Sequence, residues 1–183
     1  MHRRKLLTVA CALGVLACGA CFLPPLREPP PPLPPSLAAV RTIAVQIEDS
    51  SAHDLIHEAP MSAAVASNFN RLWAEFPVRA LPYVEAGRYD AVLKVTIIQK
   101  TVSGGSTSHG NQLWTFEILA SLALTASDGR ILQSETNQRS RFGFSSKIGL
   151  APGTWNSAPI RNQAAYALAM TVGDRLLFVP SSQ

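Results

Sequence analysis

Cysteine is almost absent from this chain of 183 residues. Its three copies, Cys11, Cys18 and Cys21, all precede residue 22. A domain formed by the rest of the chain therefore has no disulfide, no thiolate nucleophile and no cysteine cage for a metal ion.

The chain also lacks a real excess of charge, although its formal net charge is +4. Three of the 16 basic residues, Arg3, Arg4 and Lys5, lie in a short positive start that we expect to be removed. The rest of the chain has 13 basic and 12 acidic residues, so it is nearly neutral. Such a domain lacks the basic surface that attracts nucleic acid, so we expect no nucleic-acid partner.

Recognisable catalytic sets are missing too. The sequence has no Gly-x-Ser-x-Gly elbow and no serine with an evident base and acid. His53 and His57 have a spacing at which two imidazoles can share a helix face and bind zinc, but their segment is polar and offers no third ligand. The run at 104–106 (Gly-Gly-Ser) lacks the lysine of a phosphate-binding loop. We therefore predict a protein that is not an enzyme and needs neither a metal nor a cofactor.

What is present begins at the N-terminus. A positive start is followed by an apolar run, 6–17, that ends in small residues, which is the pattern of a secretory signal peptide. The run is too short for a membrane span of ~20 residues. Residues 15–18 (Val-Leu-Ala-Cys) resemble the lipobox of bacterial lipoproteins, whose cysteine becomes the first mature residue and carries the lipid, palmitate included. We predict a lipoprotein signal peptide over 1–17 and lipidation at Cys18, with Cys21 as the alternative. An ordinary signal peptide with an incidental cysteine is the other interpretation.

A proline-rich segment separates this start from the rest of the chain. Residues 24–35 read PPLREPPPPLPP, with fixed φ angles and few amide donors, and so form an extended spacer. At ~3.1 Å per residue such a run reaches roughly 37 Å. We predict a lipid-anchored linker over 18–36, rather than a ligand for an SH3-type domain. A single domain follows over 37–183, long enough for a core of its own.

The first elements of that domain are a strand and a helix. Ile43, Val45 and Ile47 alternate, which predicts a strand over 40–47. Apolar residues then recur on one helical stripe after Pro60, and Pro77 is expected to end the helix. The members of this stripe are Met61, Val65, Phe69, Leu72, Trp73 and Phe76.

Further strands and a last helix follow. Period-two patterns predict strands over 90–102 and 114–125, with a possible short strand at 78–81. The Gly/Ser-rich residues 103–111 are expected to form a flexible loop, and Asp128-Gly129 a tight turn. The polar strand from Arg130 to about Phe142 should be a sheet edge. A final helix, capped by Asn156 or Ser157 and with Pro159 in its first turn, shows an apolar stripe formed by Ala165, Leu168, Ala169, Val172 and Leu176.

These elements predict an α+β fold. The order β-α-β-β-β-α gives a two-layer sandwich, in which two helices pack on one face of a mixed sheet of about four strands.

A binding surface is predicted near the polar edge strand. Arg139 and Arg141 alternate onto one face and Lys147 follows, so three cations could meet an anionic headgroup. Phe144 and Trp155, in an expected loop over 143–155, could meet acyl chains with Phe142. The alternative is a solvated edge strand whose neighbouring loop folds back on the core.

Four segments resemble the lipopolysaccharide-assembly lipoprotein family (LptE-like). Residues 41–45 (RTIAV) and the helix over 61–76 are similar to that family's first strand and helix. Residues 89–95 (YDAVLKV) resemble its strand start of the ADAVL type, and 126–132 (ASDGRIL) resemble its D-x-x-x-G-x-x-L hairpin. The likeness covers about residues 40–178.

The resemblance implies a lipoprotein anchored at the periplasmic face of the outer membrane. It would assist the transport and assembly of lipopolysaccharide together with a β-barrel translocon (LptD-like), without catalysis. Neither Gly19 nor Phe22, which follow the two candidate anchors, is the aspartate that retains lipoproteins in the inner membrane of well-known bacteria. Two alternatives stay open: an auxiliary lipoprotein of an ABC-type lipid transport system, and a lipid-anchored hydrolase.

Overall fold

The computed structural model of the chain describes residues 33–52, 54–108, 110–147 and 152–177. They all belong to one compact unit, Pro31–Gln183. The predicted signal peptide, both candidate anchor cysteines, most of the predicted linker and His53 lie outside the described residues. Within them, no helix combines the length and the hydropathy needed to cross a membrane.

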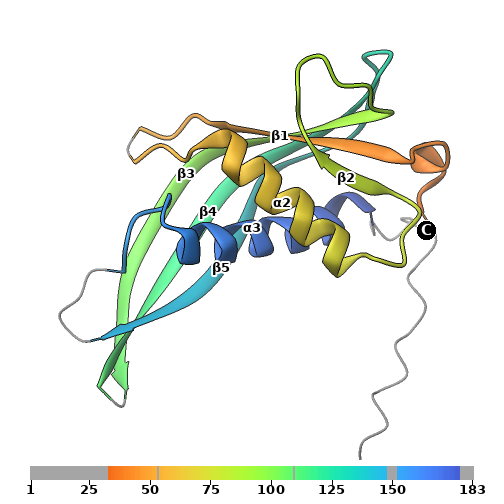
Figure 1. The fold of residues 1–183 in the computed structure, drawn as a ribbon. Coiled ribbons are helices and arrows are strands. Elements are labelled where there is room, and N and C mark those ends of the chain that lie inside the picture. The colour runs from red at the N-terminus through yellow and green to blue at the C-terminus, as the bar shows by residue number, and fades with distance from the viewer. Residues whose placement is uncertain (1–32, 53, 109, 148–151, 178–183) are drawn as a thin grey trace, which may run out of the picture. The chain divides into compact units, whose positions relative to one another are not determined.

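The unit has two long helices and five strands among its described residues (Figure 1). In chain order the elements are the short helix η2 (Pro35–Leu37), β1 (Thr42–Asp49), α2 (Glu58–Leu72), β2 (Arg79–Pro82), β3 (Ala91–Ser108), β4 (Asn111–Ala126), β5 (Ile131–Lys147), α3 (Ala158–Val172) and the terminal turn η3 (Gly173–Leu177).

The strands form one mixed sheet in the order β2-β1-β3-β4-β5. β1 pairs in parallel with β2 and with β3, whereas β3, β4 and β5 form an antiparallel meander. The predicted α+β class with two helices is therefore confirmed, and β5 is an edge strand as expected. The predicted count of about four strands and the exact order β-α-β-β-β-α are not confirmed, because the possible short strand at 78–81 is present as a fifth strand, β2.

The short strand β2 is held by a side chain from the helix layer. Asn70 of α2 accepts a hydrogen bond from the Ala80 amide and donates one to the Ala80 carbonyl, both at 2.8 Å. This side chain satisfies backbone groups of a strand that has a neighbour on one side only. A pattern of four residues gives no sign of these hydrogen bonds from Asn70, so the sequence indicates the strand only weakly.

Both helices cover the same side of the sheet and pack against each other (Figure 1). α2 lies over β1 and β2 and buries Met61, Val65 and Phe69, while α3 lies over β5 and β4. α2 ends at Leu72, before the predicted end at Phe76. Tertiary contacts accompany this early end: the Trp73 indole closely approaches Gly173, where a Cβ would overlap the ring, and its Nε1–H donates to the Ala169 carbonyl at 3.4 Å.

The inner face of the sheet, which the helices cover, carries the core. The predicted alternation in β3 and β4 is confirmed, because the inward side chains of both strands are almost fully buried. Each of them that is larger than alanine contributes roughly 1.5–3 kcal/mol by leaving water. They are Ala91, Leu93, Val95, Ile97, Phe116, Ile118, Ala120, Leu122 and Leu124.

The expected loop over 103–111 is wrong for most of its length. β3 continues to Ser108 and pairs with β4 beyond Gly104, with a register shift between Gly104 and Thr107. Gly105 lies so close to β4 that a Cβ would be 2.8 Å from the Leu113 carbonyl oxygen. Glycine here allows two backbones to approach at an irregularity in a strand pair, which is a use of glycine that a loop pattern conceals. The Asp128-Gly129 turn is confirmed, with φ +85° at Gly129.

Candidate functional site

The outer face of the sheet, opposite the helices, holds the arginines of the predicted binding surface. In β4 the side chains of Phe116 and Ile118 point into the core, so Glu117 between them points outward. Register pairs Glu117 with Arg141 and Leu119 with Arg139 across the β4–β5 strand pair. The sheet therefore brings both predicted arginines to one carboxylate.

The three side chains form an exposed charge cluster, which we call the outer triad (Glu117, Arg139, Arg141). Arg141 donates to Glu117 Oε2 from Nε at 3.0 Å and from Nη2 at 2.5 Å, and Arg139 Nη1 lies 3.5 Å from Glu117 Oε1. The hydrogen bond from Arg141 and the positive charges of both arginines hold the pKa of Glu117 below its ordinary value, although partial desolvation opposes this. The arginine side chains are 68% and 64% exposed, so both remain available to an external anion.

A small depression adjoins the outer triad. It has a volume of about 100 Å³ and is lined by Gln99, Thr101, Glu117, Leu119 and Arg139. Its walls are polar apart from Leu119, and it is bordered by both Arg139 and the Glu117 carboxylate. This arrangement suits a small polar group of a partner more than an apolar chain.

The predicted aromatic residues lie on the other face. Phe142, Phe144 and Trp155 gather around Phe116, with ring centroids 5.0, 6.5 and 5.1 Å from it. Trp155 and Phe142 are buried, and Phe144 is half-buried. The structure therefore does not bring the arginines and these aromatics onto one surface.

The separation follows from β5 being longer than expected. Residues 143–147 were predicted to begin a loop, which is wrong, because they continue the strand and its alternation. Phe144 therefore points inward as Phe142 does. Lys147 is exposed and, by the alternation of the strand, lies on the same outer face as Arg141. At ~3.3 Å per residue, however, it lies roughly 20 Å farther along the strand.

A second charge cluster, missed by the sequence reasoning, is the inner pair of Asp49 and Lys100. Lys100 Nζ lies 2.5 Å from Asp49 Oδ2, and the two side chains are only 3% and 2% exposed. Asp49 also accepts hydrogen bonds from the backbone amides of Ser51 and Ile56, at 3.0 and 2.7 Å. Burial raises the pKa of Asp49, but these hydrogen bonds, led by that from Lys100, outweigh it and hold the pKa below its ordinary value.

No sequence signal could have found the inner pair. A shift in register between Ile97 and Gln99 reverses the alternation of β3, so that Lys100 pairs with the inward-facing Ile118. The pair anchors the segment between β1 and α2, and Lys100 also donates to the Asp54 carbonyl.

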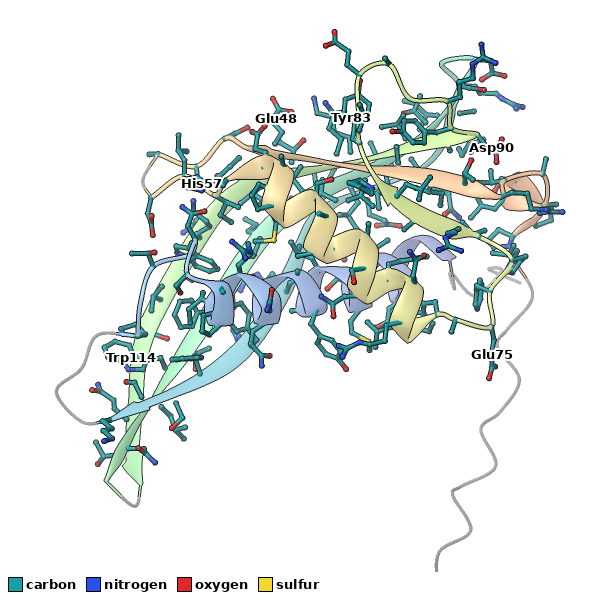
Figure 2. All side chains as sticks on the ribbon, in the orientation of Figure 1. Glu48, His57, Glu75, Tyr83, Asp90 and Trp114 are labelled. Atoms are coloured by element: carbon teal, nitrogen blue, oxygen red, sulfur yellow. The ribbon has the colours of Figure 1, made fainter. Side chains whose placement is uncertain are left out.

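His57, a member of the considered zinc pair, lies at the start of α2 (Figure 2). Its backbone amide donates to Asn156 Oδ1 at 2.7 Å, and Asn156 Nδ2 donates to the Leu55 carbonyl at 2.8 Å. These bonds tie the segment to the chain before α3. In the part of the chain that the structure describes, no three His, Cys, Asp or Glu side chains gather where they could hold a metal ion.

Comparison with known proteins gives likenesses of structure only. No protein-family model matches the sequence. No curated protein sequence matches it either. Among solved structures, the chain is similar to a minor lipoprotein from Acinetobacter baumannii, with 6% identity, a TM-score of 0.39 and coverage of 74% of this chain and 91% of that one.

Two other similar structures are a PelC dodecamer from Paraburkholderia phytofirmans and the rare lipoprotein B from Shewanella oneidensis. The first has 11% identity, a TM-score of 0.38 and coverage of 80% of this chain and 95% of that one. The second has 12% identity, a TM-score of 0.33 and coverage of 73% and 94%. At these TM-scores the similarities carry no argument about what this chain does.

Proposed function

We propose that this chain is a non-enzymatic lipoprotein, anchored through Cys18, whose folded unit binds a partner beside the outer triad. The state of three carboxylates supports the non-enzymatic part of this proposal. Those with a lowered pKa are occupied by structural contacts: Asp49 by Lys100, Glu117 by Arg141, and Asp90 by the amides of Arg41 and Thr42. Such groups are not poised to exchange a proton near neutral pH.

The observation that carries the proposal is the length and position of β5. It has 17 residues and lies at the end of the strand order, so one side of its backbone has no neighbouring strand among the described residues. Natural edge strands are usually short or covered, because a long free edge pairs readily with another chain. Arg139 and Arg141 lie on this strand, where their charge opposes self-pairing and can select a partner. A long edge with adjacent cations suits a partner that adds a strand or presents an anionic surface.

The finer proposal is a role in lipopolysaccharide transport and assembly at the outer membrane, together with a β-barrel translocon of the LptD-like kind. The family resemblance of residues 41–45, 61–76, 89–95 and 126–132 supports it. The residues after both candidate anchors, Gly19 and Phe22, also support an outer-membrane location. The exposed arginines of β5 fit the phosphate and carboxylate groups of lipopolysaccharide.

Site-specific photo-crosslinking followed by detergent extraction tests the partner. A photoreactive residue at the exposed Ser145 of β5 should crosslink to a β-barrel protein, whereas the same residue at the exposed Ala63 of α2 should not. Failure to recover any barrel, under conditions that preserve other barrel complexes, would refute the translocon role. Recovery of an inner-membrane ABC complex instead would establish the alternative function.

The anchor is tested separately. In cells fed labelled palmitate, Cys18→Ala should abolish labelling and release the protein from membranes, while Cys21→Ala should leave both unchanged. The reverse result would place the anchor at Cys21. Labelling of neither cysteine would show that the signal peptide is an ordinary one.

A further inference from the structure

A polar groove lies between α2 and α3. The two helices contact each other and cover the same side of the sheet (Figure 1). Its volume is about 540 Å³. Asn68 and Arg71 of α2 line one wall, and Asn162, Gln163 and Tyr166 of α3 line the other. Exposed side chains on both walls place the groove on the solvent side of the helix layer, away from the core and from the outer triad.

The charge of this groove is unbalanced. None of its lining residues is acidic, and Arg71 is the only charged residue that lines it within the described part of the chain. Arg71 Nη2 donates to the neutral Asn68 Oδ1 at 2.9 Å, and its guanidinium lies 5.8 Å from the Tyr166 ring centroid. Among the described residues Arg71 forms no ion pair, which distinguishes it from Arg139 and Arg141.

The rest of the lining offers hydrogen-bonding groups that the fold does not use. The side-chain amides of Asn162 and Gln163 and the hydroxyl of Tyr166 make no hydrogen bond within the described residues, and Tyr166 is 39% exposed. Amides that both donate and accept suit vicinal hydroxyl groups. A tyrosine ring offers an apolar face to the C–H groups of a sugar ring. A guanidinium with free N–H groups binds a carboxylate through two parallel hydrogen bonds.

We propose that this groove binds a saccharide that carries a carboxylate. The carboxylate pairs with Arg71, the sugar ring lies against Tyr166, and the hydroxyl groups bond to Asn162 and Gln163. This site goes beyond the proposed function, because it requires neither a barrel partner nor a lipid.

Two trisaccharides that differ only in charge test the site. Cellotriuronic acid and cellotriose share one backbone, and only the first carries carboxylates at C6. Calorimetric titration of the full purified chain in detergent should show binding of the acidic trimer at least about tenfold tighter than that of the neutral trimer. Equal affinities, or no binding of the acidic trimer, would overturn the proposal.

Variants assign the binding to the groove. Arg71→Gln should lower the affinity for the acidic trimer about tenfold and leave that for the neutral trimer unchanged. Tyr166→Ala should weaken both. Arg88→Gln makes the same change in net charge at an exposed position between β2 and β3, and should have no effect. An equal loss in Arg88→Gln and Arg71→Gln would reduce the effect to overall charge and overturn the site.

The natural saccharide can belong to a lipid-linked glycan or to a free polymer. Two probes distinguish these sources: a delipidated acidic core oligosaccharide of lipopolysaccharide and a free oligouronate. Tighter binding of the first indicates a lipid-linked glycan, and tighter binding of the second indicates a free polymer. Failure here is separable from failure of the partner proposal, because Arg71→Gln should still crosslink to a barrel through Ser145.

Discussion

The two charge clusters of this sheet contain the same kinds of group and serve different ends. The inner pair of Asp49 and Lys100 is sealed beside the core, with 2% and 3% of its side chains exposed, and it fixes the segment that leads into α2. The outer triad has the same close contacts but keeps two arginines mostly in water. A short ion-pair distance alone therefore does not identify a functional site, because burial decides whether the charges can meet a ligand.

Breaking the inner pair should have the largest effect. Lys100→Met leaves the Asp49 carboxylate buried without its partner, and a loss of about 3–5 kcal/mol in the free energy of unfolding is expected. Lys94→Met is the matched control, because Lys94 pairs with Glu48 at 2.6 Å but both side chains are nearly half exposed. Its cost should be about 0–1 kcal/mol. Urea unfolding at pH 7 measures both, and similar losses would contradict the distinction drawn from burial.

Removing both inner charges should be less harmful than removing one. In Asp49→Asn combined with Lys100→Met, the amide oxygen can still accept a hydrogen bond from Ile56 or Ser51, and no charge remains buried. We expect the double variant to lose about 1–3 kcal/mol, mainly from the weakened hydrogen bonds. A double-mutant cycle in urea measures the coupling. A double variant less stable than Lys100→Met would show that the buried charge is not the source of the cost.

Acid should weaken the inner pair. The pKa of Asp49 is lowered in the folded state, so its stabilising contribution is present above the ordinary value of 3.8 and is lost as the pH falls through the folded pKa. The wild type should therefore lose stability progressively below about pH 5. The double variant keeps Asp90 and Glu117, whose pKa values are also lowered, so the difference between the two curves reports Asp49. Parallel curves would contradict this assignment.

The sequence predicted those parts of the fold that rest on periodicity. Alternation located the inward faces of β3 and β4, and a helical stripe located Met61, Val65 and Phe69. It failed where tertiary contacts replace local pattern. Asn70 supports a strand too short to show a period, and the approach of Trp73 to Gly173 accompanies the early end of α2.

For the candidate site, alternation placed Arg139 and Arg141 together but could not supply Glu117 as their shared partner, because that depends on cross-strand register. The ion pair of Asp49 and Lys100 could not be predicted either. A register shift of one residue in β3 turns Lys100 from the outer face to the inner face, and the surrounding sequence contains no signal of this shift. The aromatic residues were misplaced for a simpler reason, since Gly143, Ser145 and Ser146 are residues typical of a loop.

Changing the outer triad should alter stability least and binding most. Glu117→Gln removes the carboxylate that both arginines contact, so in a Cys18→Ala background the protein should bind vesicles containing phosphatidylglycerol more strongly than its parent. Salt should suppress the gain, because the arginines are exposed and their charge is screened within about 10 Å at 0.1 M. Glu48→Gln makes the same change in net charge elsewhere, at the exposed pair with Lys94. If it raises vesicle binding equally in a sedimentation assay, the gain reflects overall charge and the triad is a structural cluster like the inner pair. A gain confined to Glu117→Gln, lost again when Arg139→Gln and Arg141→Gln are added, would show that the triad holds two arginines ready for an anion.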